Sequence, residues 1–297
     1  MFDVPILVIA YNRVEFTHDL FTEIRKMHPT KLYVAADAAP SEERIMARQC
    51  LKVRSVFMPE WPCELNEMHL EKHLGKSQIF LQAMNWFFER ETEGIVLFDD
   101  TLPSASFFHY CKEMLDHFRD DRRIGHISGC NILKYRDLPT SYYFSAYPCP
   151  WGFATWRDRW QGFDLKMRGI TESTLPELTK EHYILKNKTV QFWIRRYRLL
   201  SQQQIDIWEY QYIFHLWQMG MLSVNPDMNL VENRGFVNKK KRRLRKLNRP
   251  IGKLDHIVHN EVVEQDAKAD RFIFRRYFRM DRMTFLRRWI EENILND

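Results

Sequence analysis

Two adjacent carboxylates, Asp99 and Asp100, offer the most specific chemistry in this sequence. They directly follow the apolar run of residues 95–98 (IVLF), which predicts a buried strand, and Pro103 lies just ahead of a predicted helix. Ligands of open α/β sheets bind just beyond the carboxyl ends of the strands. Carboxylate oxygens there can hold a divalent cation, and that cation could bind a diphosphate. Because acid pairs also form turns and helix caps, the neighbouring strand ends decide between the two interpretations.

Two other predicted strands also end in polar side chains. Residues 5–10 (PILVIA) precede Tyr11 and Arg13, and residues 31–36 (KLYVAA) precede Asp37. Arg13 could contact a phosphate or a base, Tyr11 could stack on a base, and Asp37 could accept from a uracil N–H. Taken alone, Arg13 is more typical of a solvated helix start, and Asp37 of a turn. Together, the strand ends would deliver a cation, an acid and an acid pair to one edge of a sheet.

The first half of the chain alternates predicted strands and helices. This alternation predicts a mostly parallel sheet with helices on both faces. Ser41, followed by Glu42 and Glu43, is typical of a helix N-cap. We expect helices at 14–27, 41–56, 76–90 and 104–118, and further strands at 94–98 and 124–130. After residue 135 we expect a strand at 142–146, helices at 189–204 and 207–219, a turn, strand and loop over 220–238, and one or two helices over 267–294.

The basic character of the chain is local. Residues 239–249 (KKKRRLRKLNR) carry eight basic groups and no acid, and without them the formal net charge falls from +6 to −2. A solvated loop, attachment to an anionic membrane and contact with nucleic acid are the three interpretations of this run. Attachment to a membrane is favoured, because the following segment contains the basic, amphipathic stretches RFIFRRYF and FLRRWI. Nucleic-acid binding is unexpected, since no recognised nucleic-acid-binding motif occurs.

The composition favours a folded protein in a reducing compartment. The chain has 297 residues, of which 45% are apolar, so a large core is possible. Its five cysteines include no CxxC pair, which argues against a structural zinc site. The first residues, MFDVPILVIA, predict a strand rather than a signal peptide, and no run of 18 apolar residues occurs. We therefore expect a cytoplasmic protein, with peripheral attachment to the inner face of a membrane through residues 239–249.

Five segments, in order, resemble glycosyltransferases of the GT-A fold. They are PILVIAYNR (5–13), KLYVAADA (31–38), GIVLFDDTLPSASFF (94–108), YYFSAYPCPWGFATWRDRW (142–160) and WEYQYIFHLWQMG followed by NLVENRGF (208–236). The chain resembles a bacterial group of nucleotide-sugar transferases and, more distantly, the Golgi N-acetylglucosaminyltransferase I family.

This resemblance implies an α/β architecture with a Rossmann-like, mostly parallel sheet. The GT-A domain would cover residues 1–238, with a nucleotide-binding half (1–135) and an acceptor half (136–238). A basic and mainly helical C-terminal segment (239–297) would follow.

The resemblance also implies roles at the strand ends. Arg13 and Asp37 would bind the nucleotide, with Ala10 lining the uracil and Tyr11 beside it. Asp100 matches the metal-binding acid, for Mn²⁺ or Mg²⁺.

The usual strand-end motif of such families is Glu-Asp-Asp, whereas this chain has Phe98-Asp99-Asp100. Asp99 matches the acid near the ribose and the donor sugar. Phe98 replaces the carboxylate that supports the nucleoside, so this departure concerns donor affinity and activity.

Further candidates lie in the second half of the resemblance. Glu209 in WEYQ matches an acid near the acceptor, where a base could deprotonate the attacking hydroxyl. The alternatives are a helix-surface acid or a partner of Trp156 or Arg157. Trp151 and Gly152 match a family motif, WGWATW, and would line the donor or acceptor cleft, whereas Trp156 is expected in the core.

Two weaker candidates remain, and two histidines are not candidates. Lys76 begins a predicted helix, whose N-terminus could meet a phosphate; a solvated lysine is the alternative. Arg234 falls where the family has a loop that closes over the donor, and an arginine there could hold the diphosphate or lie on the surface. His69 and His73 are four residues apart but lack a third metal ligand, so packed or exposed histidines are expected.

The function implied by the resemblance is a metal-dependent, inverting, hexosyltransferase-type glycosyltransferase. It would move a sugar from a nucleotide-diphosphate donor, most simply a UDP-sugar, to a glycan or lipid-linked acceptor such as lipopolysaccharide. One rival is a catalytically weak or inactive relative that binds nucleotide or glycan, and a second is an adaptor that binds membrane or nucleic acid through residues 239–249. A nucleotidyltransferase is disfavoured, because AYNRVEF after the first strand contains no glycine.

Overall fold

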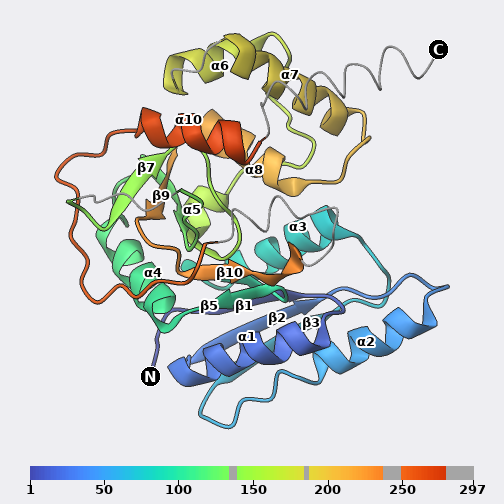
Figure 1. Cartoon of the computed structure of the whole chain (residues 1–297). Helices are drawn as coiled ribbons and strands as arrows, with labels where there is room; N and C mark the ends of the chain where they lie inside the picture. Colours follow the sequence, from blue (N-terminus) through green and yellow to red (C-terminus); the bar gives the residue numbers. More distant parts are fainter. Residues whose placement is uncertain (134–138, 184–186, 237–248, 279–297) are drawn as a thin grey trace.

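The computed structural model describes residues 1–133, 139–183, 187–236 and 249–278 (Figure 1). Within these residues, eight strands form one mixed sheet in the order β3-β2-β1-β4-β8-β6-β9-β7. The strands are β1 (Ile6–Ala10), β2 (Lys31–Ala36), β3 (Glu64–His69), β4 (Glu93–Phe98), β6 (Ile124–Ser128), β7 (Tyr142–Ser145), β8 (Phe153–Trp156) and β9 (Leu222–Pro226). The expected α/β architecture with a large sheet flanked by helices is confirmed.

The strand directions place the carboxyl ends of β1, β2 and β4 next to one another. Strands β3, β2, β1 and β4 are parallel, and β6 and β9 are also parallel. Strand β8 runs antiparallel to both β4 and β6, and β7 runs antiparallel to β9. In the register of the central strands, Ile9 of β1 lies opposite Ala35 of β2 and Phe98 of β4. The residues that follow these positions therefore meet at one edge of the sheet.

Helices cover both faces of this sheet. They are α1 (Val14–Met27), α2 (Arg44–Arg54), α3 (Lys76–Phe88), α4 (Ala105–His117), α5 (Arg157–Trp160), α6 (Thr174–Tyr183), α7 (Asn187–Ser201), α8 (Trp208–Gln218), the 3₁₀ helix η1 (Arg234–Phe236) and α10 (Ala267–Arg276). Figure 1 shows α1 and α2 on one side of the parallel strands and α3 on the other.

The apolar runs of the sequence fill two cores, one on each face. Side chains alternate along a strand. Ile6 and Val8 therefore enter the cluster that contains the buried side chains of α1 and α4, whereas Leu7 and Ile9 enter the cluster that contains those of α3. Burial on both faces explains why these strands are continuously apolar rather than alternating.

The start of α2 differs from the expectation. Ser41 does not cap this helix, because α2 begins three residues later, at Arg44, after the N-cap residue Glu43. The Glu43 N–H instead donates to Pro40 O at 3.0 Å, which closes a turn over these residues. The prediction of an N-cap at Ser41 was therefore wrong.

Several elements were not predicted. Strand β3 has the sequence ELNEMH and lies at the edge of the sheet, where it pairs only with β2 and keeps polar side chains in solvent. Its sequence therefore lacks the run of apolar residues from which buried strands are predicted. Strand β8 lies within the aromatic segment 142–160, and α6 precedes the expected helix at 189–204.

Helix α10 packs on the same core as the first 238 residues. Ala269, Ile273 and Phe274 of α10 belong to the larger apolar cluster. Asp270 is buried and accepts hydrogen bonds from Ser145 Oγ and from Ala146 N, the latter at 3.1 Å. The division of the chain at residues 238 and 239 stays a prediction.

The C-terminal segment is only partly described. Residues 239–248 of the basic run and 279–294 of the expected closing helices lie outside the described residues. Within the described part, no helix has the length and the apolar character needed to cross a bilayer.

Candidate functional site

The acid pair and Arg13 meet at the carboxyl edge of the sheet. Arg13 Nη1 lies 2.9 Å from Asp99 Oδ1 and 2.6 Å from Asp100 Oδ2, so one guanidinium bridges both carboxylates. The Tyr11 N–H donates to Asp99 Oδ2 at 2.9 Å. The Asp99 side chain is 5% exposed, and that of Asp100 is 15% exposed. Burial raises the pKa of Asp99 above its usual range, and the Arg13 guanidinium opposes this rise.

Asp37 organises the loop before α3. Its Oδ1 accepts from Ala38 N at 2.9 Å and Leu74 N at 3.0 Å, and its Oδ2 accepts from Gly75 N at 3.2 Å. His73 Nδ1 also lies 2.9 Å from Oδ2. This buried carboxylate is thus surrounded by donors of its own chain. Its predicted contact with a base N–H would have to share oxygens that already accept these bonds.

His73 is a member of the site that the sequence did not indicate. Its ring stacks on Tyr11, with centroids 5.4 Å apart and an angle of 29° between the planes. The sequence offers only its four-residue spacing from His69, a spacing that lacks a third metal ligand. The contact follows from the hydrogen bonds that Asp37 accepts from residues 74 and 75, which hold this loop near the end of β1.

Lys76 and Glu209 form an ion pair between the N-termini of α3 and α8. Lys76 Nζ also lies 6.0 Å from the centroid of the Trp208 ring. The Lys76 side chain is 55% exposed, so it is a partly solvated lysine that also has an ion-pair partner.

Glu209 keeps one oxygen, Oε2, that is buried without a hydrogen-bond partner among the described residues. Neither alternative partner of Glu209 bonds to it: Arg157 Nε donates to Glu91 O, and Trp156 Nε1 has no acceptor in the described part of the chain.

Phe98 belongs to an aromatic stack between the acid pair and the Lys76–Glu209 pair. Its ring lies 5.7 Å from that of Trp208, at 26°, and 6.4 Å from that of Phe80, at 29°. The rings of Phe80 and Trp208 stack on each other at 3.5 Å. The side chain that replaces the family's glutamate is thus part of an apolar wall.

Strand β10 (Val231–Asn233) brings the loop of Arg234 and Gly235 onto the acid pair. It pairs antiparallel with β5 (Thr101–Pro103), and Arg234 N donates to Asp100 O at 2.7 Å. A Cβ on Gly235 would lie 2.1 Å from Asp100 Oδ2, so the backbone passes directly over this carboxylate.

The Arg234 side chain turns away from the acid pair. It forms an ion pair with Asp19 and lies 5.3 Å from the centroid of the Phe16 ring, both on α1. In this arrangement the guanidinium is engaged with α1, and its predicted contact with a diphosphate would require it to leave Asp19.

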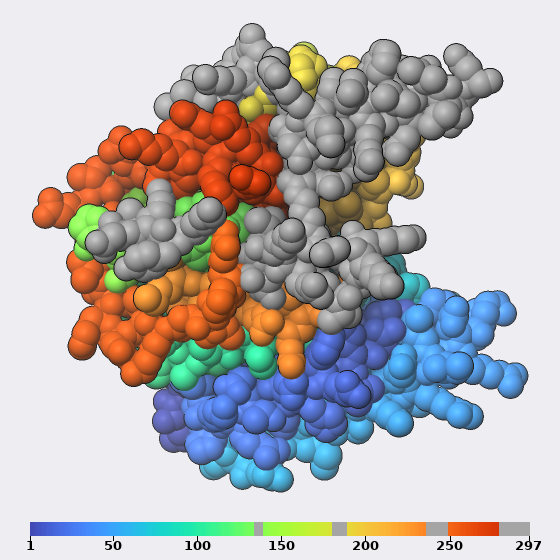
Figure 2. Space-filling model, viewed as in Figure 1, coloured from blue at the N-terminus to red at the C-terminus, as the bar shows by residue number. Residues whose placement is uncertain are grey.

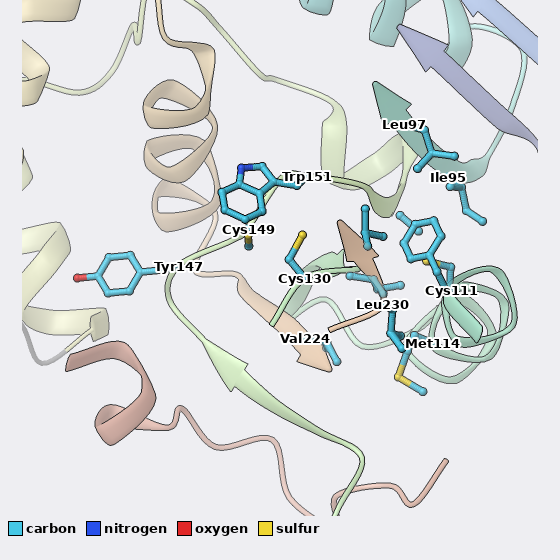
Figure 3. Packing of buried hydrophobic residues seen from close by; sticks show 14 of the residues in the cluster. Ile95, Leu97, Cys111, Met114, Cys130, Tyr147, Cys149, Trp151, Val224 and Leu230 are labelled. Atoms are coloured by element: carbon cyan, nitrogen blue, oxygen red, sulfur yellow. The ribbon is translucent and has the colours of Figure 1, made fainter. Parts of the chain in front are cut away.

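Trp151 and Gly152 lie in the interior. Trp151 is 6% exposed and contacts Tyr277 edge to face, with ring centroids 5.8 Å apart. Figure 3 shows its ring beside Cys130 and Cys149. Little of the ring is left for a substrate, whereas the expected core position of Trp156, 2% exposed, agrees with the structure.

The backbone conformation at residue 152 requires a glycine. Its φ of +114° is one that L side chains rarely adopt, and a Cβ there would lie 3.2 Å from Leu97 and Val231. The close approach that the sequence suggested is therefore made to the protein's own core.

The carboxylates fit a metal that takes most of its ligands from a substrate. In the described residues, no group of three or more His, Cys, Asp or Glu side chains could enclose an ion. Mg²⁺ is commonly held by one or two carboxylates together with substrate phosphates and water, and Asp99 and Asp100 supply such a pair. Asp100 is the more accessible of the two, because both oxygens of Asp99 already accept bonds.

Comparison with known proteins gives only distant likenesses. No protein-family model matches the chain, and neither does any curated protein. A mannosyltransferase from Pyrobaculum calidifontis, solved with GDP-Man and Mn²⁺, is 14% identical, with a TM-score of 0.38 over 72% of this chain and 69% of that one. A 4-diphosphocytidyl-2C-methyl-D-erythritol synthase from Anaerococcus prevotii is 6% identical, with a TM-score of 0.39 over 83% and 98% of the two chains. An inositol-1-phosphate CTP transferase from T. maritima is 10% identical, with a TM-score of 0.39 over 85% and 99%.

At these identities and TM-scores, the likenesses carry no argument about function.

Proposed function

We propose that this protein is a metal-dependent, inverting glycosyltransferase that uses a nucleotide-diphosphate sugar, most simply a UDP-sugar. The observations that support the proposal are the meeting of Arg13, Asp99 and Asp100 at the carboxyl edge of the sheet and the ion pair between Lys76 and Glu209. A cation site and a carboxylate base are the two chemical groups that such a transfer needs.

The donor would bind along the ends of β1, β2 and β4. Asp100, with Asp99 beside it, would hold Mn²⁺ or Mg²⁺, which when bound neutralises charge on the diphosphate leaving group. Arg13 would then be free to contact the nucleotide. The stacked Tyr11 and His73 rings offer a flat surface to a base, next to Ala10 and the Asp37 loop.

Glu209 would act as the base. One of its oxygens would take the proton from an acceptor hydroxyl as that hydroxyl oxygen forms a bond to the anomeric carbon of the donor. The bond from this carbon to the diphosphate oxygen breaks at the same time, and its electron pair leaves with the nucleotide. Attack from the side opposite the leaving group inverts the anomeric centre. Lys76 holds Glu209 in position and balances its charge.

Turnover of UDP-sugars with Mn²⁺ or with EDTA tests this proposal. We expect Asp100→Ala to lower the rate of donor hydrolysis or transfer at least 100-fold, and Glu209→Gln to lower it about 10²–10⁴-fold, as for loss of a general base. Asp3→Asn is the matched control, because Asp3 pairs with Lys112 and lines a cleft with Pro5 and Lys31, near the amino ends of the strands. Turnover that persists in EDTA and is unchanged in Asp100→Ala would rule out the mechanism.

A binding-only relative is the second candidate, and Phe98 is the observation that favours it. Its place in the aromatic stack leaves the nucleoside without the usual supporting carboxylate. Calorimetry with UDP and Mn²⁺, alongside the turnover assay, separates the candidates. Tight UDP binding without turnover of any donor would favour the binding-only relative.

The acceptor is proposed to be a glycan or a lipid-linked glycan, which agrees with the predicted attachment of residues 239–249 to an anionic membrane. An adaptor that acts through this run alone would lose its function when the run is removed. A transferase lacking the run would still turn over a soluble donor.

A further inference from the structure

The outward face of α2 carries a row of cations. Arg44, Arg48 and Lys52 are spaced four residues apart, so they lie on one side of the helix in successive turns. All three are exposed, whereas Cys50 and Val53 on the opposite side are buried. Residues Arg44–Arg54 (RIMARQCLKVR) contain no acid.

None of these three cations forms an ion pair with a described residue. Arg54, in contrast, turns inward and donates to Leu70 O at 2.6 Å and to Asp37 O at 3.3 Å. Glu42 and Glu43 are exposed too, but they precede the first turn and lie at one end of the row.

Large apolar side chains flank this row in solvent. Ile45 is 77% exposed and Leu51 is 63% exposed, and they project on either side of the line of cations by helix geometry. Met58, just after the helix, is 69% exposed. Isolated exposed apolar residues are common, but here two flank one basic row on the same helix, and a third follows four residues after that helix ends. We call Arg44, Ile45, Arg48, Leu51, Lys52 and Met58 the α2 patch. Figure 2 shows the light blue segment that includes α2 projecting from the body of the molecule.

We propose that the α2 patch docks the protein on an anionic lipid surface. Unpaired cations would lie at the headgroups, where each basic group near such a surface strengthens binding roughly fivefold. The aliphatic side chains of Ile45, Leu51 and Met58 would enter the interfacial region and leave water. Phosphates of a nucleic acid would also attract the cations, but they offer nothing to exposed aliphatic side chains, so the lipid surface is the better match. This inference does not depend on the proposed reaction.

The patch lies beside the candidate site. On the inner side of α2, Met46 Sδ accepts from the Tyr11 hydroxyl at 2.7 Å, and Arg54 contacts the Asp37 backbone. A molecule docked through the α2 patch would therefore hold the carboxyl edge of the sheet close to the membrane. That position suits an acceptor that is attached to lipid.

Co-sedimentation of the full chain with vesicles tests the inference. The vesicles contain phosphatidylcholine alone or mixed with phosphatidylglycerol, whose anionic headgroups attract basic segments. We expect the triple variant Arg44→Gln/Arg48→Gln/Lys52→Gln to lower partitioning onto anionic vesicles at least tenfold. The control Lys166→Gln/Lys253→Gln/Lys268→Gln, which removes the same charge from exposed lysines elsewhere, should bind like the wild type.

A second variant tests the apolar part of the patch. Ile45→Ser/Leu51→Ser should weaken binding to anionic vesicles several-fold and should make the remaining binding more sensitive to salt. Circular dichroism on all variants shows that they fold.

Three results would overturn the inference: wild-type partitioning by the folded Gln triple variant, an equal loss in the lysine control, or tighter binding of the wild type to a DNA duplex than to the vesicles. The first would assign any membrane binding to another region, such as residues 239–249.

Discussion

Arg13 occupies the position between Asp99 and Asp100 that a divalent cation would also contact. Its guanidinium balances two carboxylates, of which Asp99 is almost fully buried. Leaving either acid ionised and unpaired there would be costly. The same contact means that a metal and Arg13 compete for the pair. A diphosphate that arrives with the metal gives the displaced guanidinium a new anionic partner, so metal and nucleotide are expected to bind together.

The variant Arg13→Gln tests this competition. Without the guanidinium, we expect Mn²⁺ alone to bind about tenfold more tightly, because the acid pair is no longer neutralised, and UDP to bind about tenfold more weakly. Manganese electron paramagnetic resonance and calorimetry measure the two affinities. Arg234→Gln is the control for Mn²⁺ binding, since Arg234 pairs with Asp19. Weaker Mn²⁺ binding by Arg13→Gln would show that Arg13 supports the metal site rather than competing with it.

Two short elements outside the main sheet act by their position. The chain after β10 places Gly235 over Asp100 at the candidate site, whereas α10 packs on the core and buries Asp270. A substitution in the first should change ligand binding, and one in the second should change stability.

Gly235→Ala should disturb the acid pair without unfolding the protein. The new Cβ would lie 2.1 Å from Asp100 Oδ2, so either the carboxylate or the loop must move. We expect the affinity for UDP with Mn²⁺ to fall at least tenfold, with a loss of about 1 kcal/mol or less in the free energy of unfolding, because the loop is at the surface. Gly220→Ala is the control for UDP affinity, since its Cβ would meet nothing within 4 Å; its φ of +66° makes the substitution strain the backbone there, so it is not a control for stability. Unchanged affinity in Gly235→Ala would mean that Asp100 does not bind the metal in its present position.

Asp270 should make the docking of α10 sensitive to pH. Burial raises the pKa of Asp270 from 3.8 to about 6, so the folded state holds this proton more tightly than the unfolded state. The favourable contribution of the protonated form is complete below pH 4 and is lost as the pH rises to about 6, and it amounts to about 3 kcal/mol.

Urea unfolding between pH 4 and pH 7 measures this effect. The free energy of unfolding of the wild type should fall over this range relative to Asp270→Asn, which carries no titrating proton at this position. Asp266→Asn, at the half-buried N-cap of the same helix, is not expected to remove the difference. Parallel pH profiles of the wild type and Asp270→Asn would contradict the prediction.

At the scale of the whole molecule, the sequence predicted what depends on apolar runs and strand ends. The buried strands β1, β2 and β4 and the meeting of Arg13 with the acid pair followed from that pattern. Strand β3 did not, because an edge strand keeps polar side chains in solvent. The Tyr11–His73 stack and the Lys76–Glu209 pair join residues 62 and 133 positions apart, and only the folded sheet brings them together. The predicted positions of Trp151 and Gly152 in the donor or acceptor cleft were derived from resemblance, whereas core packing decides where these residues lie.

The central claim is that a divalent cation held by Asp100 binds the diphosphate of the donor. Calorimetric titration of UDP into the protein, with Mn²⁺ or with EDTA, tests it most directly. For the wild type we expect binding that weakens at least 100-fold in EDTA, a loss of about 2.7 kcal/mol. For Asp100→Ala we expect equally weak binding with either additive. UDP binding by the wild type that is the same with Mn²⁺ and with EDTA, and that survives in Asp100→Ala, would contradict the claim.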